Sequence, residues 1–270
     1  MNFIKYLILG IIQGFTEPLP ISSSGHLLIF RELFNTNAFN DLNFEIISNF
    51  GSFIGILIIF WPDIVRLVTS FFKYLFGSKK DRPKYLNDWR YCWLIVLGSI
   101  PVGLIGFLFH KQIESVASVK LVGYCLIITA IALYLVRNAN GKRGDKELNW
   151  QDAILIGIFQ MFALLPGLSR SGMVLVGCLL CGLSKESSLK YTFMLYFPVS
   201  IASFGLSISD LAKSGIDSSL ILNYSGGLIA AAVVTYFTYR WLSNIVKNGK
   251  LWYFSIYCII MAIFVLTYFH

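Results

Sequence analysis

The chain has 270 residues, of which 56% are hydrophobic and only 13% are charged. Because a soluble domain carries about 25% charged residues, the composition excludes an ordinary soluble enzyme and predicts one integral membrane domain over residues 1–270, an all-α polytopic protein surrounded by the lipid bilayer. The net charge of +8 does not indicate a nucleic-acid partner, since Lys and Arg gather in the cytoplasmic loops of membrane proteins for topological reasons.

The chain begins with two short apolar segments separated by a polar stretch. Residues 3–12 are apolar but too few to cross about 30 Å of hydrocarbon at about 1.5 Å per residue. Pro18 and Pro20 exclude a regular helix through the polar stretch, and a second short helix is expected from about Gly25 to Phe34. Two half-length helices joined by polar backbone predict a re-entrant hairpin, which the bilayer tolerates only where protein or a water-filled cavity surrounds it.

Six later segments are long and apolar enough to be full membrane spans. The segment 64–76 carries Arg66 and Lys73 within an apolar sequence, so it is expected to be a separate amphipathic helix at the membrane surface rather than a span. Charged loops are expected at 77–90 and 137–151. The six expected spans lie at about 44–61, 91–109, 119–136, 190–207, 219–239 and 251–269.

A second pair of short apolar helices is expected at 152–165 and 172–184, and this pair repeats the first. When the chain is shifted by 147 residues, seven of sixteen positions from Gly10 onwards meet an identical residue, without a gap. The polar matches carry most weight, because apolar sequences resemble one another by composition alone. We therefore predict an internal duplication with halves at about 1–136 and 150–270. The matched pairs are Gly10 with Gly157, Ile11 with Ile158, Gln13 with Gln160, Phe15 with Phe162, Ser22 with Ser169, Ser24 with Ser171 and Gly25 with Gly172.

The order of these segments also predicts their orientation. A re-entrant pair returns to the side from which it entered, and three full spans separate the two pairs, so the pairs are expected to enter from opposite faces as an inverted repeat. About sixteen Lys and Arg residues lie on the side of residues 62–90 and about five on the other side. The positive-inside rule makes the richer side cytoplasmic, and both termini are then extracytoplasmic. This parity requires that 64–76 does not cross the membrane by itself.

In an inverted repeat the two hairpin tips meet near the middle of the membrane. Each tip ends in a serine-rich helix N-terminus, Ser22–Gly25 in one and Ser169–Gly172 in the other. Helix N-termini bind anions, and Arg170 adds a guanidinium group that matches phosphate oxygens. The tips therefore predict a phosphate-handling site. The alternative for Arg170 is a structural ion pair with Glu17, and the two roles are compatible.

Further side chains at the first tip carry reactive groups. Glu17 can act as a general base, or hold a divalent cation that bridges the carboxylate and a phosphate. His26 lies three residues beyond Ser23, so the two side chains can share a helix face and form a nucleophile-and-base or nucleophile-and-acid pair. The alternatives are a histidine that only satisfies its own hydrogen bonds, and serines that only act as N-caps.

The stretches QGFTEPLPISSSGH at 13–26 and PGLSRSG at 166–172 resemble the signature motifs of the bacterial undecaprenyl-diphosphate phosphatase family, which is linked to bacitracin resistance. The resemblance extends to Phe44–Glu45 and to the SIP at 99–101, so it covers most of the chain. It implies an enzyme that hydrolyses undecaprenyl diphosphate to undecaprenyl phosphate and inorganic phosphate, which recycles the lipid carrier of peptidoglycan synthesis. It also implies a multi-pass protein of the bacterial inner membrane with an inverted re-entrant fold and a site that opens to the extracytoplasmic side.

The resemblance also implies roles for the residues of the two motifs. Gln13 and Glu17 take the acidic-motif positions, Ser23 takes that of the proposed nucleophile, and Arg170 takes the phosphate-binding role. The family is thought to need Mg²⁺ or Ca²⁺, for which Glu17 is the expected ligand. The expected catalytic residues are Glu17, Ser23, His26 and Arg170, and the expected substrate-binding residues are Gln13, Ser22, Ser24, Gly25, Ser169, Ser171 and Gly172.

Two positions depart from the family's pattern. Val174 replaces a threonine and is expected in the first turn of a helix near the phosphate, where it cannot donate a hydrogen bond; Pro18 replaces a bulky apolar or aromatic residue. Lower activity, another prenyl diphosphate substrate or a lost activity therefore stay open. The main alternative function is a transporter or flippase for a prenyl phosphate lipid, which binds phosphate but needs no nucleophile beside an acid. The sequence also leaves open whether the protein is a homo-oligomer and which prenyl chain length it prefers.

Overall fold

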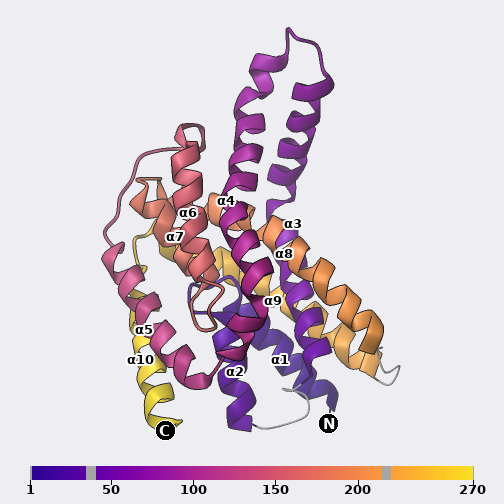
Figure 1. The fold of residues 1–270 in the computed structure, drawn as a ribbon, viewed down its shortest axis with the longest axis vertical. Helices are drawn as coiled ribbons and strands as arrows, with labels where there is room; N and C mark the ends of the chain where they lie inside the picture. The colour runs from indigo at the N-terminus through magenta and orange to yellow at the C-terminus, as the bar shows by residue number, and fades with distance from the viewer. Residues whose placement is uncertain (1, 35–40, 215–219, 270) are drawn as a thin grey trace.

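A computed structural model describes residues 2–34, 41–214 and 220–269 (Figure 1). These residues are helical apart from turns, loops and one isolated bridge between Arg143 and Leu183. The helices are α1 (Asn2–Thr16), α2 (Ser23–Phe34), α3 (Leu42–Phe76), α4 (Arg82–Ser115), α5 (Val119–Leu135), a 3₁₀ turn (Asp145–Glu147), α6 (Trp150–Phe162), α7 (Arg170–Leu180), α8 (Lys185–Ser214), α9 (Ile221–Lys247) and α10 (Trp252–Tyr268).

Three helices of the described chain are long and apolar enough to cross a membrane. These segments are Asn43–Phe76, Arg82–Phe109 and Ile221–Lys247. The expected spans at 119–136 and 251–269 correspond to α5 and α10, which have 17 residues each and so lie at the short end of the range for a span. The expected span at 190–207 lies inside α8. The protein is a multi-pass helical membrane protein.

The expectation of a separate surface helix at 64–76 is wrong. α3 continues through Pro62 to Phe76, and α4 already begins at Arg82, so only residues 77–81 of the expected loop 77–90 are not helical. The two helices form a long antiparallel pair that projects from one end of the molecule (Figure 1). Contacts along the pair explain its length: Ser70 donates to Asp88 at 2.9 Å, and the rings of Tyr74 and Trp89 stack at 4.7 Å.

The two short hairpins lie where the sequence expects them. α1 and α2 form one pair and α6 and α7 the other, and their turns approach each other in the middle of the molecule, while their outer ends point to opposite ends (Figure 1). α1 packs along α9 and α6 packs along α4. These two crossings bring backbones together, because a Cβ added to Gly10 would overlap the carbonyl of Gly227 and one added to Gly157 would overlap the carbonyl of Gly98.

Hydrogen bonds between helices lie within the apolar core. α10 packs along α5, where Ser255 donates to the carbonyl of Ala130 at 2.7 Å. Tyr191 of α8 donates to the carbonyl of Leu94 in α4 at 2.6 Å, and Thr235 of α9 donates to that of Gly14 in α1 at 3.1 Å. The helices around the two hairpin turns are thereby held in register, which fixes the polar groups that meet there.

Candidate active site

The turn between α1 and α2 is shaped by its prolines and by Ser22. Pro18 and Pro20 follow the end of α1, and Ser22 adopts a positive φ of 70°, the only positive φ of a non-glycine residue in the described chain. Such a conformation is uncommon for a residue with a side chain and is found where the surroundings hold it. The hydroxyl of Ser22 accepts from the N–H of Gly25 at 3.3 Å, so Ser22 caps α2 and brings the helix N-terminus to the tip.

The second tip binds the backbone of the first. Ser169 caps α7 by accepting from the N–H of Gly172 at 3.1 Å. The hydroxyls of Ser169 and Ser171 donate to the carbonyl of Leu19, at 3.5 and 3.0 Å. Gly172 also packs closely on the first tip, because a Cβ there would lie 3.2 Å from Cβ of Pro20. The two motif stretches therefore meet, as the sequence predicts.

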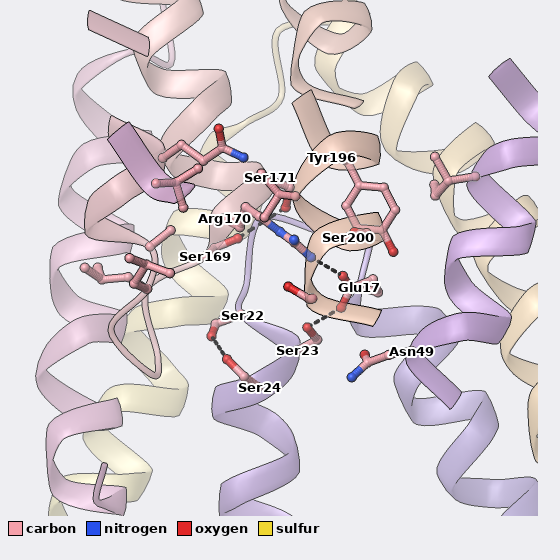
Figure 2. A pocket seen from close by; sticks show the side chains of 18 of the residues that line it. Glu17, Ser22, Ser23, Ser24, Asn49, Ser169, Arg170, Ser171, Tyr196 and Ser200 are labelled. Carbon is pink, nitrogen blue, oxygen red and sulfur yellow. Dashed lines mark hydrogen bonds and ion pairs between the residues drawn. The ribbon is translucent and has the colours of Figure 1, made fainter. Parts of the chain in front are cut away.

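Glu17 is the centre of the contact between the tips (Figure 2). Its Oε1 accepts from Nη2 of Arg170 at 2.8 Å, and its Oε2 accepts from the Ser23 hydroxyl and from Nε2 of Gln13, the latter at 3.0 Å. Gln13 also donates to Asn49 of α3 at 2.6 Å. The Glu17 side chain is only 8% exposed, so its negative charge depends on Arg170 and these donors for compensation. Arg170 and Glu17 thus form the ion pair that the sequence suggests as an alternative role for Arg170.

Arg170 is held from the other side by an aromatic ring. Its guanidinium carbon lies 4.7 Å from the centroid of the Tyr196 ring in α8, a cation–π arrangement that fixes the plane of the guanidinium group. The side chain of Arg170 keeps 32% of its surface exposed. A guanidinium group has five N–H donors, and the ion pair with Glu17 uses Nη2 alone, so donors are left for an incoming anion.

A cavity of about 280 Å³ lies between the tips, α3, α6 and α8. Its lining includes Glu17, Ser22, Ser23 and Ser24 from the first tip and Ser169, Arg170 and Ser171 from the second. The other expected binding residues, Gln13, Gly25 and Gly172, do not line it. Gln13 donates to Glu17 and Asn49, and the two glycines lie where the tips pack together: a Cβ on Gly25 would lie 3.1 Å from Cα of Gly167. The cavity thus combines one carboxylate, one guanidinium group and five hydroxyls from the two motifs.

His26 makes its side-chain hydrogen bonds to residues other than Ser23. It is 2% exposed and does not line the cavity. Its Nδ1 lies 2.8 Å from the carbonyl of Ser22 and its Nε2 lies 2.7 Å from the hydroxyl of Tyr257 in α10. A carbonyl only accepts, so Nδ1 carries a proton, and when the ring is neutral Nε2 accepts from Tyr257. His26 therefore bonds to the backbone of Ser22, and its catalytic role stays a prediction.

Val174 also lies elsewhere than expected. It is fully buried in the hydrophobic core, within α7, and it does not line the cavity. Although Val174 is close to Ser171 in sequence, the rotation of the helix directs its side chain to neighbouring helices. The missing hydroxyl at this position therefore removes no donor from the cavity.

Several lining residues were not expected from the sequence. Asn49 and Glu45 come from α3, Tyr196 and Ser200 from α8, and Gln160 from α6. Each is a polar residue inside an apolar segment, which is itself a signal of function at membrane depth. That signal does not say which polar residue faces the site, because α3 and α8 reach the cavity only through the tertiary packing.

Comparison with known proteins gives consistent matches over nearly the full chain. The family model described as "Bacitracin resistance protein BacA" matches residues 6–264. The chain is 40% identical to "Undecaprenyl-diphosphatase 3" of Bacillus anthracis over 266 residues, which cover 98% of this chain and 97% of that protein. It is 38% identical to "Undecaprenyl-diphosphatase" of Oceanobacillus iheyensis, over 99% of this chain and 97% of the relative. It is 35% identical to "Undecaprenyl-diphosphatase 1" of Halalkalibacterium halodurans, over 98% of this chain and 95% of that protein.

Proposed function

The chain belongs to the family of bacitracin resistance protein BacA, and from this membership and the site we propose how it works as an undecaprenyl-diphosphatase. The protein is an enzyme that hydrolyses undecaprenyl diphosphate to undecaprenyl phosphate and inorganic phosphate, and so recycles the lipid carrier of cell-wall synthesis. The observation that supports this chemistry most directly is the Glu17 carboxylate, which accepts from the Ser23 hydroxyl and from Arg170 at the same time.

Ser23 is the nucleophile in the proposed reaction, and Glu17 is its base. The Ser23 hydroxyl already donates to Oε2 of Glu17, so the carboxylate can take the proton while Oγ attacks the terminal phosphorus. The bond from that phosphorus to the bridging oxygen breaks, and undecaprenyl phosphate leaves with the proton that Glu17 had taken, which restores the carboxylate. Glu17 then deprotonates a water molecule that attacks the phosphoserine, and it returns this proton to Oγ as inorganic phosphate is released and Ser23 is freed. Direct attack by water uses the same base but gives Ser23 no covalent role.

Positive charge in the cavity stabilises the transition state. Charge spreads over the oxygens of the phosphoryl group during transfer, and fixed donors aimed at these oxygens lower the barrier. Arg170 provides a guanidinium group, and the N-termini of α2 and α7 lie at the two tips, where their partial positive charge favours an anion. The ring of Tyr196 keeps Arg170 in place when the phosphate competes with Glu17 for it.

We propose that the cavity also binds a divalent cation that is shared with the substrate. In the described chain, no group of three or more His, Cys, Asp or Glu side chains could hold a metal ion, but two carboxylates, Glu17 and Glu45, line the cavity. Mg²⁺ is often bound by one or two carboxylates together with substrate phosphate oxygens. A bound cation would neutralise phosphate charge. If Glu17 helps to hold it, a chelator should lower phosphate release, and Mg²⁺ or Ca²⁺ should restore it; full activity in excess chelator would remove the cation from the proposal.

We propose further that α1–α5 and α6–α10 are inverted halves, at about 1–136 and 150–270, and that each short hairpin is re-entrant. Three observations support this arrangement. The hairpins point in opposite directions (Figure 1); Ser22 and Ser169, which are 147 residues apart, cap α2 and α7 alike; and the glycine crossing of α1 with α9 has a counterpart between α6 and α4. The basic loops near α3–α4 are proposed to be cytoplasmic, in the bacterial inner membrane, with the cavity open to the other side.

The activity is tested with purified protein in detergent. Undecaprenyl diphosphate is added and inorganic phosphate is measured. The proposed enzyme releases phosphate in a reaction that requires Ser23 and Arg170. A flippase with the same phosphate-binding cavity would bind the lipid but release none, so binding without phosphate release from well-folded protein would decide for the transporter.

A further inference from the structure

Gln160 has a buried amide without a partner. It lies near the end of α6 and is 1% exposed. Both its Nε2 and its Oε1 are shielded from solvent and make no hydrogen bond within the described chain. A polar group buried in this way is costly, because it has given up its bonds to water and gained none in return. Most buried polar groups do have a partner, so an exception of this kind calls for an explanation.

The matching glutamine of the first half is used differently. Gln13, which is 147 residues earlier, donates from Nε2 to Glu17 and to Asn49. Four residues after Gln160 the chain has Leu164 instead of a carboxylate. The amide of Gln160 therefore has no acid to hold on its own helix, although it occupies the equivalent position. A polar side chain at this place in an apolar helix needs a hydrogen-bond partner from outside the protein chain.

The cavity supplies the place for that partner. Gln160 lines it together with Arg170 and Ser171, and it is the only cavity-lining residue of the described chain whose fully shielded side-chain atoms lack a partner. The hydroxyls of Ser23 and Ser171 already donate within the protein, to Glu17 and to Leu19. A diphosphate brings many acceptor oxygens into this space, more than these engaged donors can serve. The Gln160 Nε2–H group is a donor that binding does not first have to release.

We infer that Gln160 is a substrate-binding residue that donates from Nε2 to an oxygen of the diphosphate group. This inference rests on the proposed function, since the anion in question is the substrate of the phosphatase. It assigns a binding role to the second half that mirrors the role of Gln13 beside the base: the first glutamine orients Glu17, and the second holds the diphosphate. Catalysis and substrate binding thereby divide between two equivalent positions.

The test compares Gln160→Met with the wild type for binding of a non-hydrolysable methylene-bridged prenyl diphosphate. Methionine has nearly the same length but cannot donate, and a hydrogen bond to a charged group is strong enough that its loss should weaken binding by about tenfold or more. The melting temperature in detergent should stay equal or rise, because the variant buries no amide. Binding equal to that of the wild type would overturn the inference, and would mean that the amide serves only a trapped water molecule.

Two further variants complete the experiment. Gln160→Glu keeps the shape but places a carboxylate near the diphosphate, so it should bind the analogue at least tenfold more weakly; wild-type binding here would also overturn the inference, even if Gln160→Met is unstable. Thr192→Val is the matched control, because Thr192 lines the cavity but donates to the carbonyl of Ser188 at 2.7 Å, and it should bind normally. Since binding is measured without turnover, the result stands even if the wild type releases no phosphate, which would refute only the proposed function.

Discussion

Glu17 accepts three hydrogen bonds, and each of them has a distinct consequence. In the proposed reaction the bond from Ser23 prepares the nucleophile, the ion pair with Arg170 compensates the charge, and the bond from Gln13 fixes the orientation of the carboxylate. Arg170 would there serve both the carboxylate and the incoming phosphate, so substrate binding would change the environment of the proposed base.

The first prediction concerns these three residues. Glu17→Gln, Ser23→Ala and Arg170→Ala should each lower phosphate release at least roughly a hundredfold, the usual size for the loss of one catalytic group or electrostatic donor. The effect is measured as turnover of purified variants in detergent, with the melting temperature as a control for folding. Arg170→Lys is the matched variant: it keeps the charge but not the planar fork, so it should regain only part of the activity. Wild-type turnover in Arg170→Ala would rule out the joint site.

A second prediction at this scale separates positioning from chemistry at His26. Tyr257→Phe removes the donor to Nε2 of His26 and leaves a buried acceptor unsatisfied, which should cost about 1–3 kcal/mol of stability. Turnover should fall less than roughly tenfold, because the bond from Nδ1 to Ser22 stays. Unfolding in detergent and phosphate release are the two measurements. A hundredfold loss of turnover at unchanged stability would show instead that His26 takes part in the reaction.

At the scale of the elements, the short hairpins were predictable and the long one was not. The two prolines and the serine caps mark the turn at 17–22 locally, and the repeat carries the same pattern to the second hairpin. By contrast, Arg66 and Lys73 in the segment 64–76 predict a helix apart from the preceding span, whereas α3 continues through this segment, where contacts with α4, such as Ser70 with Asp88, stabilise it. Prediction of the site is limited in the same way. Glu17 and Arg170 lie in motifs that the sequence shows, whereas Tyr196 contacts Arg170 only because of the packing of α8.

The close crossing of α6 and α4 gives a prediction for an element. In Gly157→Val the new side chain would overlap the Gly98 carbonyl and lie against Pro101, so α6 must move away from α4. Overpacking of this kind typically costs about 1–3 kcal/mol, and phosphate release should fall because α6 carries the second tip. Thermal unfolding in detergent measures the first effect. Ile158→Val is the control, because Ile158 is the next residue and is 36% exposed, and this change should leave the stability unaltered. Equal stability of the two variants would show that α6 and α4 are not so close.

At the scale of the whole molecule, charge and shape agree with one orientation. Lys79, Lys80 and Arg82 lie where α3 and α4 meet, at the projecting end of the molecule, and both termini lie toward the other end (Figure 1). α3 runs without interruption through 64–76, so this segment adds no separate membrane crossing. The argument that the two hairpins enter from opposite faces requires this condition. The proposed orientation, with the basic end in the cytoplasm, follows from this charge distribution.

Cysteine labelling in intact cells checks this orientation. An impermeant thiol reagent should label Ala117→Cys, between α4 and α5, and should not label Asn140→Cys, between α5 and α6. Both positions are exposed in the structure, so access depends on the side of the membrane. The parent protein, with its five cysteines, provides the background, and permeabilised cells should label both variants. Labelling of Asn140→Cys from outside would reverse the assignment.

The ion pair at the site joins residues 153 positions apart, and this separation has a consequence for biogenesis. At about 5–20 residues per second of translation, roughly 8–30 seconds pass between the synthesis of Glu17 and that of Arg170. During this interval the first hairpin carries an acidic group with no counter-ion, and a lone charge is expelled from hydrocarbon. The nascent α1–α2 segment therefore waits near the aqueous interface until the second half is made. A ribosome-stalled chain that ends before Arg170 should leave Ile21→Cys open to water-soluble reagents, whereas the completed protein, in which Ile21 is 2% exposed, should protect it.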